Sequence, residues 1–303
     1  MKPTDPRSPL ILARVIALPD TRGRIDHLAV DIPGRRLFVA EVANGTVDVV
    51  DLTAGKVIGR LSGLTEPQGI AWLPDRAELV VGCGDGTVRF FAAADRHETA
   101  RIVLGEDADN VRVDARNGRV VVGYGSGGLA VIDPATHRIL SRTLFKGHPE
   151  GFRLSGGQAF VNVPDDGAVL SVDLDQQKVL ARWSTGLHRM NFPLAIEPSG
   201  QHLVTVYRLP PTLARIDTRT GMTVSSAAAC GDADDLFLVG DRALVVCGAG
   251  YVQVASRGKT QARVASSPGA RTGLYVPEWR QLLVAAPARD ASAAIWVMVL
   301  RAE

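Results

Sequence analysis

Cysteine is scarce in this sequence: the 303 residues include only Cys83, Cys230 and Cys247. Three cysteines without a Cys-x-x-Cys pair exclude a fold held together by a disulfide framework. Long apolar runs are also missing, since none approaches the roughly 18 residues that a membrane-spanning helix needs. The net charge is only +2, and no basic stripe or run of like charge occurs. We therefore expect neither nucleic acid nor a membrane as a partner.

Helical signals are equally sparse. No long segment combines a 3.6-residue apolar period with a capping box. Aromatic residues make up 5% of the chain, whereas 46% of it is hydrophobic and glycine occurs 31 times. Small apolar side chains together with many glycines are typical of short strands joined by tight turns. The composition therefore favours an all-β fold with a full core.

One pattern recurs along the chain: a polar cluster, an apolar strand, a turn, a valine-rich strand, a glycine turn, a strand that ends in aspartate, and a last strand. The first apolar residue of each opening strand is taken as the index residue of its repeat. The index residues are Leu28, Ile70, Val111, Phe152, Leu194, Leu236 and Leu274. They stand 42, 41, 41, 42, 42 and 38 positions apart. Such a period, with four strands per unit, predicts a seven-bladed β-propeller.

The first repeat shows the pattern most clearly. Its strands are expected at residues 28–30, 36–40, 46–50 and 56–61, and Asn44-Gly45 is a strong hairpin signal. Four repeats carry an aspartate just before a turn, namely Asp51, Asp133, Asp173 and Asp217. Repeated metal ligation is one interpretation of these aspartates. Turn initiation is the preferred one, because an aspartate side chain bonds the backbone two residues on.

The seventh repeat is one strand short, because the chain ends soon after the strand expected at residues 294–299. An unassigned apolar stretch at residues 10–18 can supply the missing strand. This pairing of the two chain ends closes the ring and removes an open sheet edge. We therefore predict one propeller domain over residues 1–303, with a flexible N-terminus at residues 1–9 and a closing strand at residues 10–18.

Polar residues gather just before the inner strands. In an antiparallel blade, the loops that enter the first strand and leave the second lie on the same face, so these residues should meet at one mouth of the central channel. The residues two positions before the index residues are Asp26, Gln68, Asp109, Glu150, Phe192, Asp234 and Thr272. The residues predicted to bind a ligand at this mouth are Asp26, His27, Asp109, Asn110, Glu150, Asn191, Asp234, Asp235 and Arg271.

Several carboxylates around one opening repel each other unless a cation or an arginine lies among them. Such an oxygen-rich ring suits Ca²⁺ or Mg²⁺, with Asp26, Asp109, Glu150 and Asp234 as the metal ligands. Alternatively, Arg208 and Arg271 pair with the carboxylates or hold an anionic ligand. A third interpretation is that water fills the mouth and the side chains only satisfy the ends of the strands.

The cysteines give a test of the strand directions. Cys230 precedes the inner strand of the sixth repeat, and Cys247 ends the second strand of the same repeat. Both should lie on one face, where a disulfide requires Cα atoms closer than about 7 Å. Cys83, in the second repeat, should be free. A disulfide would argue for an oxidising compartment.

The segment at residues 37–52, Leu-Phe-Val-Ala-Glu-Val-Ala-Asn-Gly-Thr-Val-Asp-Val-Val-Asp-Leu, resembles the YVTN β-propeller repeat of the YncE-like family. The resemblance covers nearly the whole chain and is greatest to an uncharacterised bacterial branch. It rests also on the blade-specific segments at residues 23–27, 105–111, 147–150, 230–235 and 268–272. It implies the propeller fold. Related proteins are described as surface-layer, periplasmic or binding proteins, and the repeat itself carries little information on function.

Three functions remain open at this point. In the first, the channel mouth binds a small molecule, a metal ion or a protein partner without catalysis. In the second, it is the site of a metal-assisted lyase or hydrolase of the lactonase kind, with His27 or His148 as acid or base. In the third, the rim loops form a scaffold. Whether the protein is an enzyme is left undecided, and a monomer is expected. If Met1 is the natural start we expect a cytoplasmic protein, whereas a removed signal peptide would place it in the periplasm or outside the cell.

Overall fold

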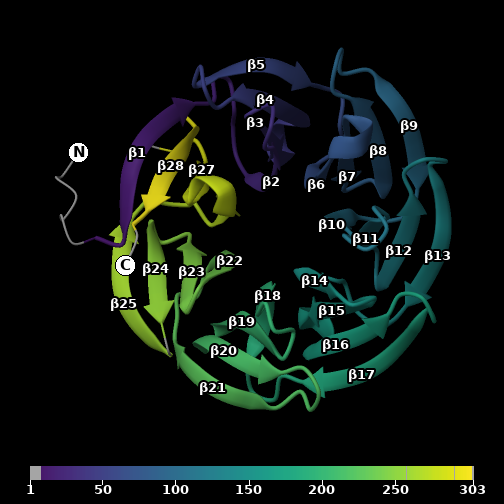
Figure 1. The fold of residues 1–303 in the computed structure, drawn as a ribbon, viewed down its shortest axis with the longest axis vertical. Coiled ribbons are helices and arrows are strands. Elements are labelled where there is room, and N and C mark those ends of the chain that lie inside the picture. The colour runs from purple at the N-terminus through teal and green to yellow at the C-terminus, as the bar shows by residue number, and fades with distance from the viewer. Residues whose placement is uncertain (1–7, 257, 290, 302–303) are drawn as a thin grey trace.

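Each predicted repeat folds into one antiparallel four-stranded sheet, and seven such sheets stand around a central axis (Figure 1). The structure is a computed structural model and describes residues 8–256, 258–289 and 291–301. Most of the predicted flexible segment, residues 1–7 of 1–9, lies outside the described residues. The fold class predicted from the repeat is confirmed, because all seven index residues fall in the innermost strand of a sheet.

The first four blades follow one another along the chain. Blade 1 contains β2 (Ile25–Asp31), β3 (Arg36–Glu41), β4 (Thr46–Asp51) and β5 (Lys56–Leu61). Blade 2 contains β6 (Pro67–Leu73), β7 (Glu78–Cys83), β8 (Thr87–Ala92) and β9 (Glu98–Val103). Blade 3 contains β10 (Ala108–Val113), β11 (Val120–Tyr124), β12 (Gly128–Asp133) and β13 (Arg138–Leu144). Blade 4 contains β14 (Phe152–Ser155), β15 (Gln158–Val163), β16 (Ala168–Asp173) and β17 (Lys178–Ser184).

The last three blades complete the ring. Blade 5 contains β18 (Arg189–Ile196), β19 (His202–Leu209), β20 (Pro211–Asp217) and β21 (Thr223–Ala228). Blade 6 contains β22 (Ala233–Val239), β23 (Arg242–Cys247), β24 (Tyr251–Ser256) and β25 (Lys259–Ala265). Blade 7 contains β26 (Thr272–Val276), β27 (Gln281–Ala286), β28 (Ala294–Leu300) and β1 (Leu10–Ala17). Short 3-10 turns lie at η1 (Val42–Asn44), η2 (Pro74–Arg76), η3 (Pro164–Asp166) and η4 (Pro277–Trp279).

The N-terminal strand closes the ring as predicted. β1 pairs antiparallel with β28, from Leu10 opposite Leu300 to Ala17 opposite Ala294. The Leu18 N–H extends the pairing by donating to the Ala293 carbonyl over 2.8 Å. Figure 1 shows β1 along the outside of β28, so that the first and last strands of the chain share one sheet. The chain ends are thereby held together by backbone hydrogen bonds.

The hydrophobic core lies between neighbouring sheets, because both faces of the middle strands are covered. Between blades 7 and 1, Leu37 and Val39 of β3 pack in one cluster with Leu283 of β27 and Ile295 of β28. Ile16 of the closing strand belongs to the same cluster and is 1% exposed. Apolar second strands are therefore needed in every blade, since each strand contributes to two blade-to-blade contacts.

The aspartates before the turns prove to be turn initiators. The carboxylates of Asp51, Asp133, Asp173 and Asp217 each accept a hydrogen bond from the backbone N–H two residues later. These bonds span 2.8 to 3.0 Å and fix the turns that join the third and fourth strands. No helix in the part of the chain that the structure describes is long and apolar enough to cross a membrane.

The inner strands approach one another closely and bend where they enter the blades. A Cβ atom on Gly69 of β6 would lie 1.6 Å from the carbonyl oxygen of Asp109 in the next blade, so this position requires glycine. The pairing register shifts just before or at the index residue in five inner strands, namely β2, β6, β10, β18 and β22. Such bulges redirect side chains, and here they turn polar groups toward the channel mouth.

Candidate binding site in the central channel

Side chains from all seven blades surround a cavity of about 280 Å³ at one mouth of the channel. The residues two positions before the index residues all line this cavity: Asp26, Gln68, Asp109, Glu150, Phe192, Asp234 and Thr272. Of the predicted ligand-binding residues, the structure brings together Asp26, His27, Asp109, Asn110, Glu150, Asp234, Asp235 and Arg271. Figure 1 shows the labelled inner strands β2, β6, β10, β14, β18 and β22 facing the centre of the ring, where this cavity lies.

Asn191 does not line the cavity, unlike the other predicted residues. Its side chain is fully buried and donates to the Asn162 side-chain oxygen over 2.9 Å and to the Ala168 carbonyl over 3.0 Å. Asn162 in turn donates to the Thr205 hydroxyl in blade 5 over 3.1 Å. The Asn191 side chain therefore connects blades 4 and 5 and faces away from the channel.

Blades 1 and 3 meet at the rim through a histidine and its neighbours. Arg24 lies 2.9 Å from one oxygen of Asp26, and His27 Nδ1 lies 2.9 Å from the other. His27 Nε2 is 3.1 Å from the Asn110 side-chain oxygen. Burial opposes the charge on both groups, but their attraction outweighs it: the pKa of Asp26 is lowered, and the pKa of His27 is raised to about 9. His27 is therefore an imidazolium at neutral pH.

Blades 5, 6 and 7 meet at the rim through a carboxylate between two arginines. Asp234 forms ion pairs with Arg208 and with Arg271, whose Nε lies 2.5 Å from Asp234 Oδ2. The Arg208 guanidinium also donates to the Ala233 carbonyl and lies 3.9 Å from the centroid of the Phe192 ring. The mouth is thus not a ring of free carboxylates, because arginines form ion pairs with two of the four predicted metal ligands, Asp26 and Asp234.

Blades 3 and 4 carry Asp109 and Glu150, the two predicted metal ligands that form no ion pair with an arginine of the described residues. The Glu150 carboxylate forms no hydrogen bond or ion pair with any residue that the structure describes. Burial and the neighbouring charge of Asp109 raise the pKa of Glu150 to about 7. Asp109 Oδ1 is buried without a hydrogen-bond partner. His148 donates from Nδ1 to the Gly125 carbonyl over 2.7 Å and places Nε2 3.7 Å from Asp109.

The imidazole of His148 is cationic in this setting. Burial disfavours the imidazolium, but the nearby Asp109 carboxylate and the hydrogen bond to the Gly125 carbonyl outweigh burial and raise the pKa of His148 to about 9. His148 can therefore attract an anion or donate a proton from Nε2.

Two arginines below the rim were not identified by the sequence analysis. Arg112 of β10 and Arg153 of β14 each stand one position after an index residue and line the cavity. Arg112 donates to the Asn110 side-chain oxygen over 2.9 Å, and Arg153 donates to the Phe152 carbonyl over 3.0 Å. Neither guanidinium forms an ion pair with a carboxylate of the described residues.

The electrostatics of this pair are unfavourable without a ligand. Burial lowers the pKa of Arg112, and burial together with the charge of Arg112 lowers the pKa of Arg153. Asp235 attracts both guanidiniums through space, but its own pKa is raised by burial and its carboxylate accepts from the Gly273 N–H. The charge of Asp109 attracts Arg112 as well, but neither arginine contacts a carboxylate directly. The sequence does distinguish Arg112 and Arg153 from the other repeats. The residues at the equivalent positions there are Ala29, Ala71, Ala195, Phe237 and Tyr275.

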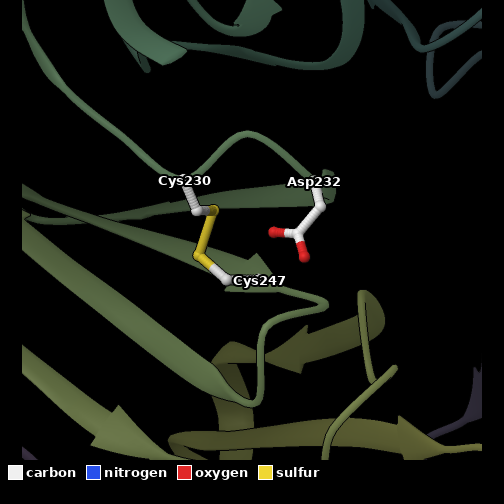
Figure 2. A group of neighbouring side chains, drawn as sticks. All are labelled: Cys230, Asp232 and Cys247. Carbon is white, nitrogen blue, oxygen red and sulfur yellow. A yellow bond between two sulfur atoms is a disulfide. The ribbon is translucent and has the colours of Figure 1, made fainter.

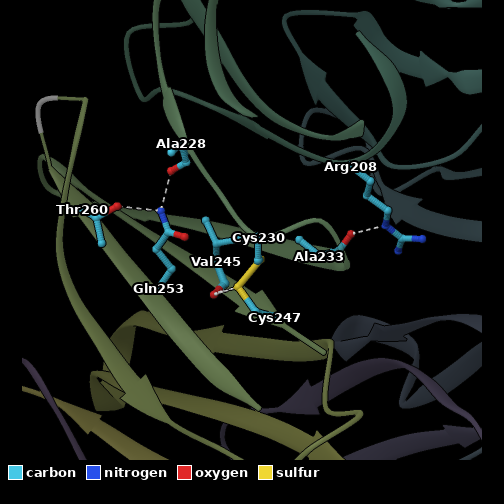
Figure 3. Close-up of a disulfide and its surroundings, with 8 residues drawn as sticks. All are labelled: Arg208, Ala228, Cys230, Ala233, Val245, Cys247, Gln253 and Thr260. Atoms are coloured by element: carbon cyan, nitrogen blue, oxygen red, sulfur yellow. Dashed lines mark hydrogen bonds between the residues drawn. A yellow bond between two sulfur atoms is a disulfide. The ribbon is translucent and has the colours of Figure 1, made fainter. Parts of the chain in front are cut away.

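The disulfide lies next to the channel mouth in blade 6. Cys230 and Cys247 are bonded, with Cα atoms 6.0 Å apart, and Cys83 is free and buried. Both predictions on the cysteines are confirmed. Figure 2 shows the Asp232 carboxylate beside the bonded sulfur atoms. Figure 3 shows that the same segment continues to Ala233, whose carbonyl oxygen accepts a hydrogen bond from Arg208. The disulfide thus fixes the segment before Asp234 to the end of β23.

The comparisons with known proteins support the fold. No protein-family model matches the sequence, and no curated protein matches it. The structure is similar to a chain described as "Kuenenia stuttgartiensis Hydrazine Synthase", with a TM-score of 0.77 and 14% sequence identity. The similarity covers 91% of this chain and 97% of that chain. At this identity it shows a shared propeller fold and carries no information on activity.

Proposed function

We propose that the channel mouth of this seven-bladed propeller binds a small molecule through an anionic group, which Arg112 and Arg153 hold. The supporting observation is that both guanidiniums lie in the cavity without a carboxylate partner among the described residues. A buried charge without a counter-ion is costly, so a ligand that supplies one gains much of that energy on binding. A carboxylate or phosphate fits, because guanidinium groups bind these anions through two parallel hydrogen bonds.

We further propose that the protein is a binding protein of the YncE-like kind in an oxidising compartment, such as the periplasm. The YVTN-type repeat at residues 37–52 supports the first part. The Cys230–Cys247 disulfide supports the second, because structural disulfides persist mainly outside the reducing cytoplasm.

Calorimetry with acetate and phosphate tests the binding proposal. Wild-type protein should bind at least one of these anions, and Arg153→Met should weaken binding about tenfold or more, equivalent to about 1.4 kcal/mol. The matched control is Arg182→Met in β17 of the same blade, whose guanidinium pairs with Asp166 away from the cavity. The control should bind as wild type does. Equal affinity of Arg153→Met and wild type would contradict the proposal.

A metal-assisted lyase or hydrolase is the second candidate. The observation that favours it is that ligand atoms of Asp26, His27 and Asp109 lie within 4.8 Å of one another. A divalent ion there would have to displace the proton of His27 and the ion pair between Asp26 and Arg24. If calorimetry with Ca²⁺, Mg²⁺ or Zn²⁺ shows tight binding that Asp109→Asn abolishes, this candidate replaces the anion site.

A further inference from the structure

The charges of the cavity are arranged in two levels on blades 3 and 4. Asp109 and Glu150 stand two positions before their index residues, at the rim. Arg112 and Arg153 stand three residues further along the same segments, deeper in the channel. In blade 3 the Asn110 amide joins the two levels, because it donates to Asp109 Oδ2 over 3.2 Å and accepts from Arg112 over 2.9 Å. Two neighbouring blades therefore present an acid above a guanidinium.

No ion pair joins the acids of the rim to the deeper arginines of blades 3 and 4. Neither arginine forms an ion pair with Glu150 or Asp109. The rim of blades 5 to 7 differs, because there Asp234 does pair with Arg208 and Arg271. The cavity therefore keeps the Glu150 carboxyl group without a hydrogen-bond or ion-pair partner near its entrance, where His148 also lies, and two guanidinium groups without a carboxylate partner further in.

We propose that the ligand of this cavity is a small zwitterion, with an ammonium group near Glu150 and a carboxylate near Arg112 and Arg153. This inference rests on the proposed anion-binding function and adds a second charge to the ligand. Amino acids, ω-amino acids and short peptides belong to this chemical class. Glu150 is the main ammonium partner, because Asp109 Oδ2 already faces His148 and the Asn110 side chain. Asp109 Oδ1 is buried without a hydrogen-bond partner.

The size of the cavity agrees with a compact ligand. Its volume of about 280 Å³ lies at the lower limit of small-molecule sites, which span roughly 300 to 1,000 Å³. The seven blades leave this space open at one mouth, so a free molecule reaches both levels by entering along the axis with its carboxylate first.

Calorimetry with probes that carry one or both charges tests the inference, and β-alanine differs from propionate only by its ammonium group. The probes are propionate, propylamine, β-alanine, 4-aminobutanoate, 6-aminohexanoate and glycylglycine. At least one zwitterion should bind about tenfold tighter than propionate, because it satisfies both levels at once. Propylamine should bind weakly, because Arg112 and Arg153 repel it. Glu150→Gln should weaken binding of the zwitterion about tenfold and leave propionate binding unchanged or strengthened.

The outcomes separate this inference from the proposed function. The control Glu278→Gln, at an exposed position in η4, should change neither affinity. If propionate binds as tightly as every zwitterion, or if Glu150→Gln strengthens binding of both classes alike, the zwitterion inference is wrong while the anion site stands. If none of the carboxylate-bearing probes binds, both are wrong.

Discussion

Removal of residues 1–17 is expected to destabilise the protein by several kcal/mol, a large part of the roughly 5 to 15 kcal/mol that stabilises a typical domain. β1 supplies the outer strand of blade 7, so its loss exposes the edge of β28 and unpairs its backbone groups. It also removes the fully buried side chains of Leu10 and Ile16 from two hydrophobic clusters. Urea denaturation followed by circular dichroism measures the effect. A truncated protein as stable as the full chain would contradict ring closure by β1.

Point substitutions in β1 give a milder form of the same test. Ile16→Ala should cost about 2 to 5 kcal/mol, because it leaves a cavity between blades 7 and 1. Val15→Ala is the matched control, since the Val15 side chain is 48% exposed and should matter little. Equal stability of the two variants would show that the face of β1 was assigned wrongly.

Loss of the disulfide is expected to cost about 3 kcal/mol, because the bond closes a loop between residues 17 positions apart. The double substitution Cys230→Ser and Cys247→Ser tests this by urea denaturation. The best control is a dithiol reductant: it should lower the stability of the wild type toward that of the variant and leave the variant unchanged. A wild type that is equally stable with and without the reductant would show that the bond is not formed in solution.

The repeat period predicted most of the fold, because each blade must bury the same faces. The index residues mark where each inner strand enters the core, and their spacing depends only on strand and turn lengths. The ring closure followed from a missing strand at one end and an unassigned strand at the other. These features are local in the sequence or follow from counting, so a single sequence reveals them.

The lining of the cavity could be predicted only in part. Asp26 and Glu150 were found because the residue two positions before an index residue lines the mouth in every blade, and it is polar in six of the seven. Asn191 stands three positions before Leu194, beyond the bulge of β18, and its side chain points away from the channel. Alternation along a strand reverses the direction of a side chain with each single step. A position shortly before an index residue is therefore not sufficient to place a side chain in the cavity.

The sequence analysis offered pairing of Arg208 and Arg271 with carboxylates as one alternative, but it could not identify Asp234 as the carboxylate that both arginines contact. Arg208, Asp234 and Arg271 come from three blades and meet only because the ring closes. Arg112 and Arg153 lie one position after their index residues, where the channel continues, whereas the predicted site residues all precede an index residue. A comparison of the position after each index residue identifies them, since the other five repeats carry apolar residues there.

The central claim is that Arg112 and Arg153 hold the anionic group of a ligand. A crystal structure of the protein soaked in selenate, a tetrahedral anion with a strong anomalous signal, tests this most directly. We predict anomalous density within hydrogen-bonding distance of both guanidinium groups, and none at that position in a crystal of Arg153→Met. Selenate bound only on the outer surface, with the two arginines turned toward Asp235 or Glu150, would contradict the account.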